Sequence, residues 1–197
     1  MTNPIDNFKK NWQEAKSLKD ANAHYCTLAT VSKTGQPSMR TIVLREVTED
    51  SFVLFINNSS PKWQELELSG QWELMVFWPS LMQQYRIQGE FSQIPMAIMK
   101  QHWANKPYDS KIIDHYYDRN QSQSSVISSR NELQEDIDKL KQEYPGEAEI
   151  PFPSNAIGIY FKADFVEEWI GVIEDRLHKR YQYLLHNDEW QKSLLVP

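Results

Sequence analysis

Three basic side chains recur at alternate positions near the carboxyl end of the chain. Arg176, His178 and Arg180 share one face if this segment is a strand. Trp169 precedes them by a few residues, and aligned basic groups beside a tryptophan suit a flat, anionic ligand. A solvent-exposed strand edge often carries the same pattern, because charged residues there protect against aggregation. The spacing alone leaves both interpretations open.

A second candidate site is the start of a predicted helix at Ser60, Pro61 and Lys62. A serine N-cap followed by proline is typical of a helix start, where free N–H groups attract anions. With Arg40 on a preceding strand, these residues indicate a phosphate site, although ordinary capping of a solvent-facing turn explains them too. Arg45 lies five residues after Arg40, so on one regular strand the two would point to opposite faces.

Several well-known catalytic patterns do not occur in the sequence. We find no GxGxxG, P-loop or nucleophile elbow, and no pair of carboxylates that stands out. The five histidines are scattered, so the sequence predicts no metal site. Basic residues and many aromatic residues without an obvious acid, base or nucleophile favour a site in which a cofactor performs the chemistry.

Composition limits the class of protein. The 197 residues predict one domain, 1–197, with a hydrophobic content of 40% and an aromatic content of 12% that suffice for a core. The formal net charge of −6 argues against nucleic-acid binding but permits a local basic pocket. No apolar run is long enough for a membrane span. The lack of a signal peptide and the single Cys26, expected to be a buried inert thiol, predict a cytoplasmic protein.

Alternating apolar residues and turn signals predict the strands that position these groups. They cover residues 25–32, 37–47, 51–56, 71–78, 83–93, 157–162, 165–170, 177–185 and 190–196. Five strands in short succession indicate an antiparallel barrel. The segments 157–162 and 165–170 are expected to pair with each other, and the last two to form a hairpin.

Helical periodicity appears at the amino end and in the middle of the chain. We predict an N-terminal helix within 1–20, a short helix over 62–69, and a helical insertion over 95–145. Ser129 and Glu132 form a capping box at the last helix of the insertion. Residues 147–155 are expected to be an extended connector.

An ordered series of segments resembles the pyridoxamine 5'-phosphate oxidase family from about Tyr25 to Pro197. The segments are ATVSKTGQPSMRTIVLREV, NNSSPK, QQYRIQGEF, KPYDS, QSSVISSR, IPFPS and EEWIGVIEDRLHKRYQY. The RLHxR element after a tryptophan is the most specific of them. The resemblance implies an α+β protein, mainly β: an antiparallel split β-barrel with peripheral helices that binds FMN as a homodimer.

The resemblance also implies roles for individual residues. Those expected to bind FMN are Arg40, Arg45, Ser60, Lys62, Gln84, Gln123, Ser124, Trp169 and Arg180. Of these, Gln123 and Ser124 are expected from a loop of the second subunit. Those expected to bind substrate are Arg45, His102, Lys106, Ser110, Arg176 and His178. Arg176 and His178 would act as the catalytic pair, holding the substrate ring over the flavin.

Some positions depart from the family pattern. Arg45 stands where a lysine usually contacts the substrate phosphate, and the two cations are not equivalent in geometry. Pro61 replaces an arginine at the FMN phosphate, and Lys106 replaces an arginine at the substrate phosphate, with one residue inserted nearby. These changes affect the identity of the substrate more than FMN binding.

The activity implied is oxidation of pyridoxamine or pyridoxine 5'-phosphate to pyridoxal 5'-phosphate, with O2 reduced to H2O2. One alternative is a relative of the phenazine-pathway flavin oxidases, which share the RLHxR element but lack the substrate-phosphate lysine. Another is a flavin-binding protein without oxidase turnover. The expected partners are a phosphorylated aromatic substrate, O2 and a second copy of the chain, and neither nucleic acid nor a membrane.

Overall fold

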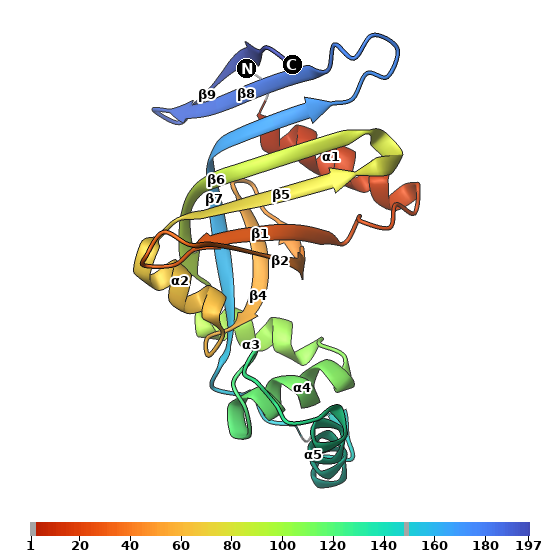
Figure 1. The fold of residues 1–197 in the computed structure, drawn as a ribbon, viewed down its shortest axis with the longest axis vertical. Coiled ribbons are helices and arrows are strands. Elements are labelled where there is room, and N and C mark those ends of the chain that lie inside the picture. The colour runs from red at the N-terminus through yellow and green to blue at the C-terminus, as the bar shows by residue number, and fades with distance from the viewer. Residues whose placement is uncertain (1–2, 148–149) are drawn as a thin grey trace.

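A strongly curled antiparallel sheet organises the chain (Figure 1). The computed structural model describes residues 3–147 and 150–197, so parts of the predicted N-terminal helix and connector lie outside it. The strands are β1 (Tyr25–Val31), β2 (Pro37–Val43), β3 (Glu46–Val47), β4 (Ser51–Asn57), β5 (Trp72–Trp78), β6 (Gln83–Gln93), β7 (Ala156–Ile170), β8 (Lys179–His186) and β9 (Glu189–Leu195). The strand order β2-β1-β5-β6-β7-β4-β3 forms the main path, and β8 and β9 extend from β7. The predicted fold class, an α+β split barrel with peripheral helices, is confirmed.

β7 is the central strand of this architecture. Its first half pairs with β4 and its second half with β8, while β6 runs along its other edge. We predicted 157–162 and 165–170 as two paired strands, which is wrong: they are one continuous strand of 15 residues. The apparent turn at Ala163 and Asp164 is instead an irregularity in the pairing with β6.

Glycine is required at that irregularity. The register between β6 and β7 shifts at Gln88/Gly89, and Gly89 has φ of 152°. A Cβ on Gly89 would lie 2.1 Å from the carbonyl oxygen of Lys162, so any side chain there would force the backbones apart. Such bulges bend a strand and increase its twist, which here helps the sheet to curl.

The main core fills the curled sheet beneath helix α1 (Pro4–Ser17). Phe8 of α1 is fully buried and packs edge-on against Phe52 and Tyr85, with ring centroids 4.9 and 5.0 Å away. On β5, alternate residues face this core while Met75 and Phe77 face the other way, as the period of two predicts. Cys26 is also buried, and burial raises the pKa of its thiol to about 12.

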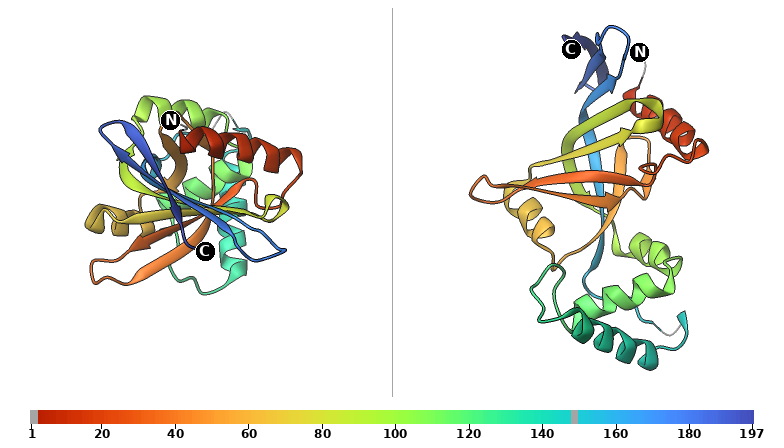
Figure 2. Two further views of the ribbon diagram at one scale, coloured as in Figure 1. Left: turned by 90° about the horizontal axis from the view of Figure 1, so that it is seen from above. Right: turned by 45° about the vertical axis from the view of Figure 1, so that its right-hand side comes forward.

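The middle of the chain folds into a small helical layer at one end of the molecule (Figures 1 and 2). It contains α3 (Met96–Ala104), α4 (Tyr108–Arg119) and α5 (Arg130–Glu143), and Ser129 caps α5 by accepting a hydrogen bond from the Glu132 N–H. These helices share a separate apolar cluster that includes Trp103, Ile112 and Tyr116. The helical insertion therefore packs largely on itself, while assignment of 1–197 as one domain stays a prediction.

The remaining helical segments are α2 (Pro61–Ser69) and a short 3-10 turn over Pro79–Leu81. α2 begins and ends where the sequence predicts, with Pro61 in its first turn and Gly70 at its carboxyl end in the left-handed region, φ 68°. Glycine adopts that conformation without the strain that a Cβ would cause. Among the described helices, none is both long and apolar enough to cross a membrane.

Candidate functional site

A cavity of about 280 Å³ opens between the sheet and the helical layer. The side chains around it come from β2, β4, the starts of α2 and β7, the helices α3 and α4, and the segments that follow β2, α3 and α4. Its lining residues are Arg40, Thr41, Ile42, Arg45, Phe55, Ile56, Asn57, Lys62, Met99, Lys106, Ser110, Ile113, Asp114, Tyr117, Gln123 and Ala156. Six of the residues predicted to bind cofactor or substrate thus line one cavity: Arg40, Arg45, Lys62, Lys106, Ser110 and Gln123.

Arg40 and Arg45 both line this cavity because the strand between them is interrupted. The predicted strand 37–47 is broken into β2 and β3, and the break falls at Leu44 and Arg45. Here the Leu44 N–H bonds to the carbonyl of His24 and the Arg45 N–H to that of Val53. Because of this break, the regular alternation that would place the two arginines on opposite faces does not extend from Arg40 to Arg45. The sequence expectation of opposite faces is therefore wrong.

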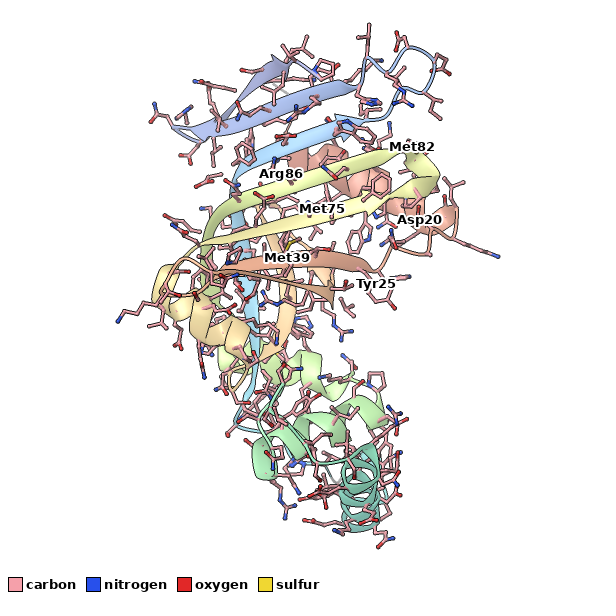
Figure 3. All side chains as sticks on the ribbon, in the orientation of Figure 1. Asp20, Tyr25, Met39, Met75, Met82 and Arg86 are labelled. Carbon is pink, nitrogen blue, oxygen red and sulfur yellow. The ribbon has the colours of Figure 1, made fainter. Side chains whose placement is uncertain are left out.

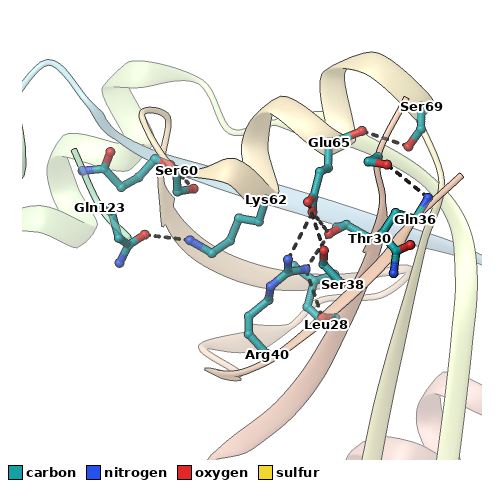
Figure 4. A network of polar contacts seen from close by, with 12 residues as sticks. Leu28, Thr30, Gln36, Ser38, Arg40, Ser60, Lys62, Glu65, Ser69 and Gln123 are labelled. Carbon is teal, nitrogen blue, oxygen red and sulfur yellow. Dashed lines mark hydrogen bonds and ion pairs between the residues drawn. The ribbon is translucent and has the colours of Figure 1, made fainter. Parts of the chain in front are cut away.

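Arg40 is fixed from behind by an acidic residue of α2 (Figure 4). Its guanidinium donates to Glu65 at 3.1 Å, to the Thr30 hydroxyl at 2.5 Å and to the Leu28 carbonyl at 3.2 Å. Glu65 also accepts hydrogen bonds from Ser38 and Thr30. Burial raises the pKa of the Glu65 carboxyl, but the hydrogen bonds from Thr30, Arg40 and Ser38 outweigh burial and lower it overall. The carboxylate thus orients Arg40 without itself lining the cavity.

Lys62, in the first turn of α2, lies beside Arg40 in the same cavity (Figure 4). Burial, and secondly the positive charge of Arg40, lower the pKa of the Lys62 ammonium to about 8. Its Nζ donates to Oε1 of Gln123 at 2.6 Å. This contact is made within one chain. The expectation that Gln123 and Ser124 come from a loop of the second subunit stays a prediction.

Asn57 is a polar group in the lining that sequence analysis missed. Its Oδ1 accepts hydrogen bonds from the N–H and hydroxyl of Ser59. Its Nδ2 is buried and has no hydrogen-bond partner within the described residues. A buried amide without a partner is costly. Ser60, which we predicted to bind FMN, is fully buried and its hydroxyl donates to the Asn57 carbonyl at 2.6 Å.

The helical side of the cavity carries an ion pair between Lys106 and Asp114. Both side chains are mostly buried, with 15% and 14% of their surface exposed. Burial raises the pKa of the Asp114 carboxyl, against the opposing charges of Lys106 and Arg45. Asp114 follows Ser110 by one turn of α4, so both face the cavity. That spacing was present in the sequence and could have identified Asp114.

A second group of predicted residues lies in one row across the sheet. The pairing aligns Phe77 with Gln84, Gln84 with Trp169, and Trp169 with Arg180, on the strands β5 to β8. Residues paired in this way share a face, and the first three line a common depression. Arg180 is held there by Glu167, with an Nη2 to Oε1 distance of 3.0 Å. Figure 3 shows this face of the sheet, with Met75 and Arg86 labelled.

Arg176 and His178 precede β8 rather than lying in it. β8 begins at Lys179, and Arg176 has φ of 60°, so the predicted strand 177–185 starts too early and its alternation does not apply. His178 nevertheless packs on Trp169, with ring centroids 4.9 Å apart, and its Nδ1 accepts the Val172 N–H at 3.1 Å. Arg176 is exposed in this loop. The loop, rather than the alternation of a strand, therefore places His178 beside Trp169.

Two predicted residues lie beside the cavity rather than in its lining. His102 of α3 packs on Phe55, a lining residue, with ring centroids 5.0 Å apart. Ser124, with φ of 72°, contacts a different cavity between α4 and α5. Neither residue is part of the lining of the cavity that contains Arg40 and Lys106. Their roles in binding stay predictions.

The residues at the cavity and the row of residues beside Trp169 lie at different ends of the molecule. The cavity adjoins the helical layer, whereas Trp169 and Arg180 lie where β7 pairs with β8, towards the opposite end of the long axis (Figures 1 and 2). The linings of the cavity and of the depression beside Trp169 share no residue. Within one chain, the structure therefore brings six predicted residues together at the cavity and a second group, which includes Gln84, Trp169 and Arg180, on the sheet, but it does not join the two groups.

Comparison with known proteins identifies the class to which this fold belongs. The structure of PhzG from Burkholderia lata 383, in complex with tetrahydrophenazine-1-carboxylic acid, superposes with a TM-score of 0.90 at 21% identity, covering 100% of this chain and 94% of that one. A pyridoxamine 5'-phosphate oxidase-related, FMN-binding protein from Nostoc punctiforme superposes with a TM-score of 0.77 at 19% identity, covering both chains fully. The chain has the fold of these proteins.

Sequence comparison is more specific. The family model described as pyridoxamine 5'-phosphate oxidase matches residues 12–144. Proteins named pyridoxine/pyridoxamine 5'-phosphate oxidase from Cyanothece sp. and Crocosphaera subtropica are 32% and 34% identical to this chain. Each alignment covers 99% of this chain, and 89% and 90% of the relatives. The chain therefore belongs to the pyridoxamine 5'-phosphate oxidase family, which confirms the resemblance stated from its motifs.

Proposed function

We propose that this protein is an FMN-dependent oxidase that converts pyridoxamine or pyridoxine 5'-phosphate to pyridoxal 5'-phosphate. The observation that carries the proposal is the cavity itself, which is lined by four cations, Arg40, Arg45, Lys62 and Lys106. Family membership supplies the activity to be tested. When bound, the flavin would accept a hydride from the exocyclic carbon of the substrate and pass the electrons to O2, giving H2O2.

The residues near the start of α2 fit the phosphate of FMN. Arg40 is held in place by Glu65, and Lys62 is mostly buried, so both cations are positioned before a ligand arrives. An anion beside them favours the protonated form of Lys62, whose pKa is lowered in the ligand-free protein. We assign FMN contacts here to Arg40, Lys62 and Gln123.

Arg45 and the polar residues on the helical side of the cavity fit the acidic group of the substrate. Arg45 lies on the sheet side, and Lys106 and Ser110 face it from the segment before α4 and from α4. Arg45 is exposed and stacks near Phe55, so its guanidinium can reach an anion in the cavity. These groups would neutralise and orient the substrate without themselves exchanging protons with it.

A complete site requires a second copy of the chain. Gln84, Trp169, His178 and Arg180 form their own row, remote from the cavity of the same chain. We infer that the row of one subunit closes over the cavity of its partner, where Trp169 and Arg180 would contact the flavin. Arg176 and His178 would then hold the substrate ring.

The activity is tested by flavin content and turnover. The purified protein should be yellow, and mass spectrometry of the released cofactor should identify FMN rather than FAD. Pyridoxamine 5'-phosphate should elicit steady H2O2 release, measured beside a dihydrophenazine-like substrate. A colourless protein that ignores added FMN rules out the cofactor, and a yellow protein active only on the second compound rules out the substrate.

The shared site is tested with mixed dimers of Lys62→Ala and Trp169→Ala chains, isolated by two affinity tags. If the halves come from different subunits, one site of each mixed dimer carries both changes and the other carries none. The mixed dimer should then bind one FMN with the affinity of the unaltered protein. If each site lies within one chain, both sites are damaged and no such binding remains.

A further inference from the structure

Asp114 places a negative charge in a cavity otherwise lined by cations. Among the described residues of the lining, it is the one carboxylate, beside Arg40, Arg45, Lys62 and Lys106. It pairs with Lys106, and both side chains are more than four-fifths buried. This pair lies in the part of the cavity that we assign to the acidic group of the substrate, so the argument rests on the proposed function.

The position of Asp114 differs from that of Glu65, the other carboxylate near these cations. Glu65 lies behind Arg40, bonds to Thr30 and Ser38, and does not face the cavity. A ligand can therefore approach Arg40 without meeting that carboxylate. Asp114 faces the cavity, so an anion that approaches Lys106 also meets the Asp114 carboxylate.

The three charges around the proposed site of the acidic group partly cancel. Arg45 and Lys106 contribute two positive charges and Asp114 one negative charge, which leaves a net charge of +1. A carboxylate carries one negative charge, whereas a phosphate ester carries nearly two above its second pKa of about 6. A dianion gains from two cations but is repelled by Asp114, and in a partly buried site such terms are large.

We propose that Asp114 determines specificity for the charge of the substrate, by occupying Lys106 and weakening the binding of a phosphate dianion relative to a monoanionic carboxylate. A phosphate group must separate Lys106 from Asp114 or bind Arg45 alone. The same residue therefore limits affinity for a phosphorylated substrate.

The test uses the FMN-loaded protein and the variant Asp114→Asn, which keeps the shape of the side chain and removes its charge. Pyridoxal 5'-phosphate and pyridoxal share a ring and differ in the phosphate, so the ratio of their dissociation constants isolates the phosphate contribution. Both are measured through the flavin absorbance change and by calorimetry at about pH 8, where the phosphate is a dianion. We expect the variant to raise the preference for the phosphate by about tenfold or more, the size of one charged interaction.

Asp109→Asn is the matched control. Asp109 lies on the same helix, but its side chain is 74% exposed, pairs with Lys141, and lines the cavity between α4 and α5 instead. This variant should leave the ratio unchanged. Thermal unfolding of both variants checks that the fold is retained, and Asp114→Ala repeats the charge removal if the asparagine variant fails to fold.

An unchanged or smaller ratio in the Asp114 variants would overturn the proposal, because it would show that the pair only positions Lys106. Inorganic phosphate separates this result from failure of the proposed activity. If the protein does not oxidise pyridoxamine 5'-phosphate or bind either ring compound, calorimetric titration of the FMN-loaded protein with inorganic phosphate takes their place. Binding about tenfold tighter in Asp114→Asn supports the proposal. Equal, weaker or undetectable binding to that variant overturns it.

Discussion

Replacing Lys62 by methionine should stabilise the ligand-free protein and weaken its affinity for FMN. Burial and the charge of Arg40 lower the pKa of Lys62 from 10.5 to about 8. A shift of about 2.5 units corresponds to roughly 3 kcal/mol of unfavourable free energy for the protonated amine in the fold. Loss of the hydrogen bond to Gln123 offsets about 1 kcal/mol of the gain. We therefore expect the variant to be about 2 kcal/mol more stable near pH 7.

The difference between the two proteins should depend on pH in a defined direction. The native pKa of Lys62 lies below the unfolded value, so between about pH 8 and pH 10.5 the unfolded chain binds more protons than the native state. Wild-type stability therefore rises with pH through this window relative to the variant. Other groups titrate in both proteins, so their contributions cancel in the difference.

The assay is urea unfolding of the protein stripped of FMN, near pH 7 and near pH 10, with the exposed Lys33→Met as the control. The stability gained by Lys62→Met should be largest near pH 7 and small near pH 10. In parallel, FMN should bind the variant about ten- to a hundredfold more weakly, since one charged contact is lost. A destabilised variant, a gap that widens with pH, or unaltered FMN affinity would each refute this account of Lys62.

Three further variants test other predicted contacts. Lys106→Ala should lower kcat/KM for pyridoxamine 5'-phosphate by about one to two orders of magnitude and leave the FMN dissociation constant nearly unchanged, and Arg176→Ala should lower kcat/KM at least as much. Both effects are read from steady-state H2O2 release, and unaltered turnover would remove these residues from the substrate site. Glu65→Ala should destabilise the protein by about 3 kcal/mol in urea unfolding, because it frees Arg40 and two hydroxyl groups. Less than about 1 kcal/mol would mean that this network is solvated rather than structural.

The predictable part of the fold rests on local signals. Period-two alternation identified β5, and the sequence Ser60-Pro61 with Gly70 fixed both ends of α2. β7 was divided in two because Ala163 and Asp164 interrupt its apolar pattern. Ala163 is nevertheless buried, and the bulge at Gly89 on the partner strand accommodates the irregularity. That accommodation depends on a residue about seventy positions away, which no local pattern records.

The candidate site was predictable in composition but less so in arrangement. The cations that line the cavity follow from motif positions, whereas the ion pair of Lys106 with Asp114 depends on how α4 packs against the sheet. The placement of Gln123 beside Lys62 likewise depends on the path of a polar loop. The orientation of the Asn57 amide likewise depends on Ser59, whose N–H and hydroxyl both donate to Oδ1, while Nδ2 has no partner within the described residues.

The two carboxylates near the cavity are expected to affect ligand binding differently because they lie on different sides of the cations that they pair with. Glu65 and Asp114 each neutralise one cation, and the sequence gives no reason to treat them differently. Glu65 also bonds to Thr30 of β1 and Ser38 of β2 and lies outside the cavity lining. It therefore restrains the Arg40 side chain without blocking a ligand from reaching it. Asp114 shares the cavity with the ligand, so it competes for the cation that it holds. Removing the first charge should therefore cost stability, and removing the second should change selectivity towards anions.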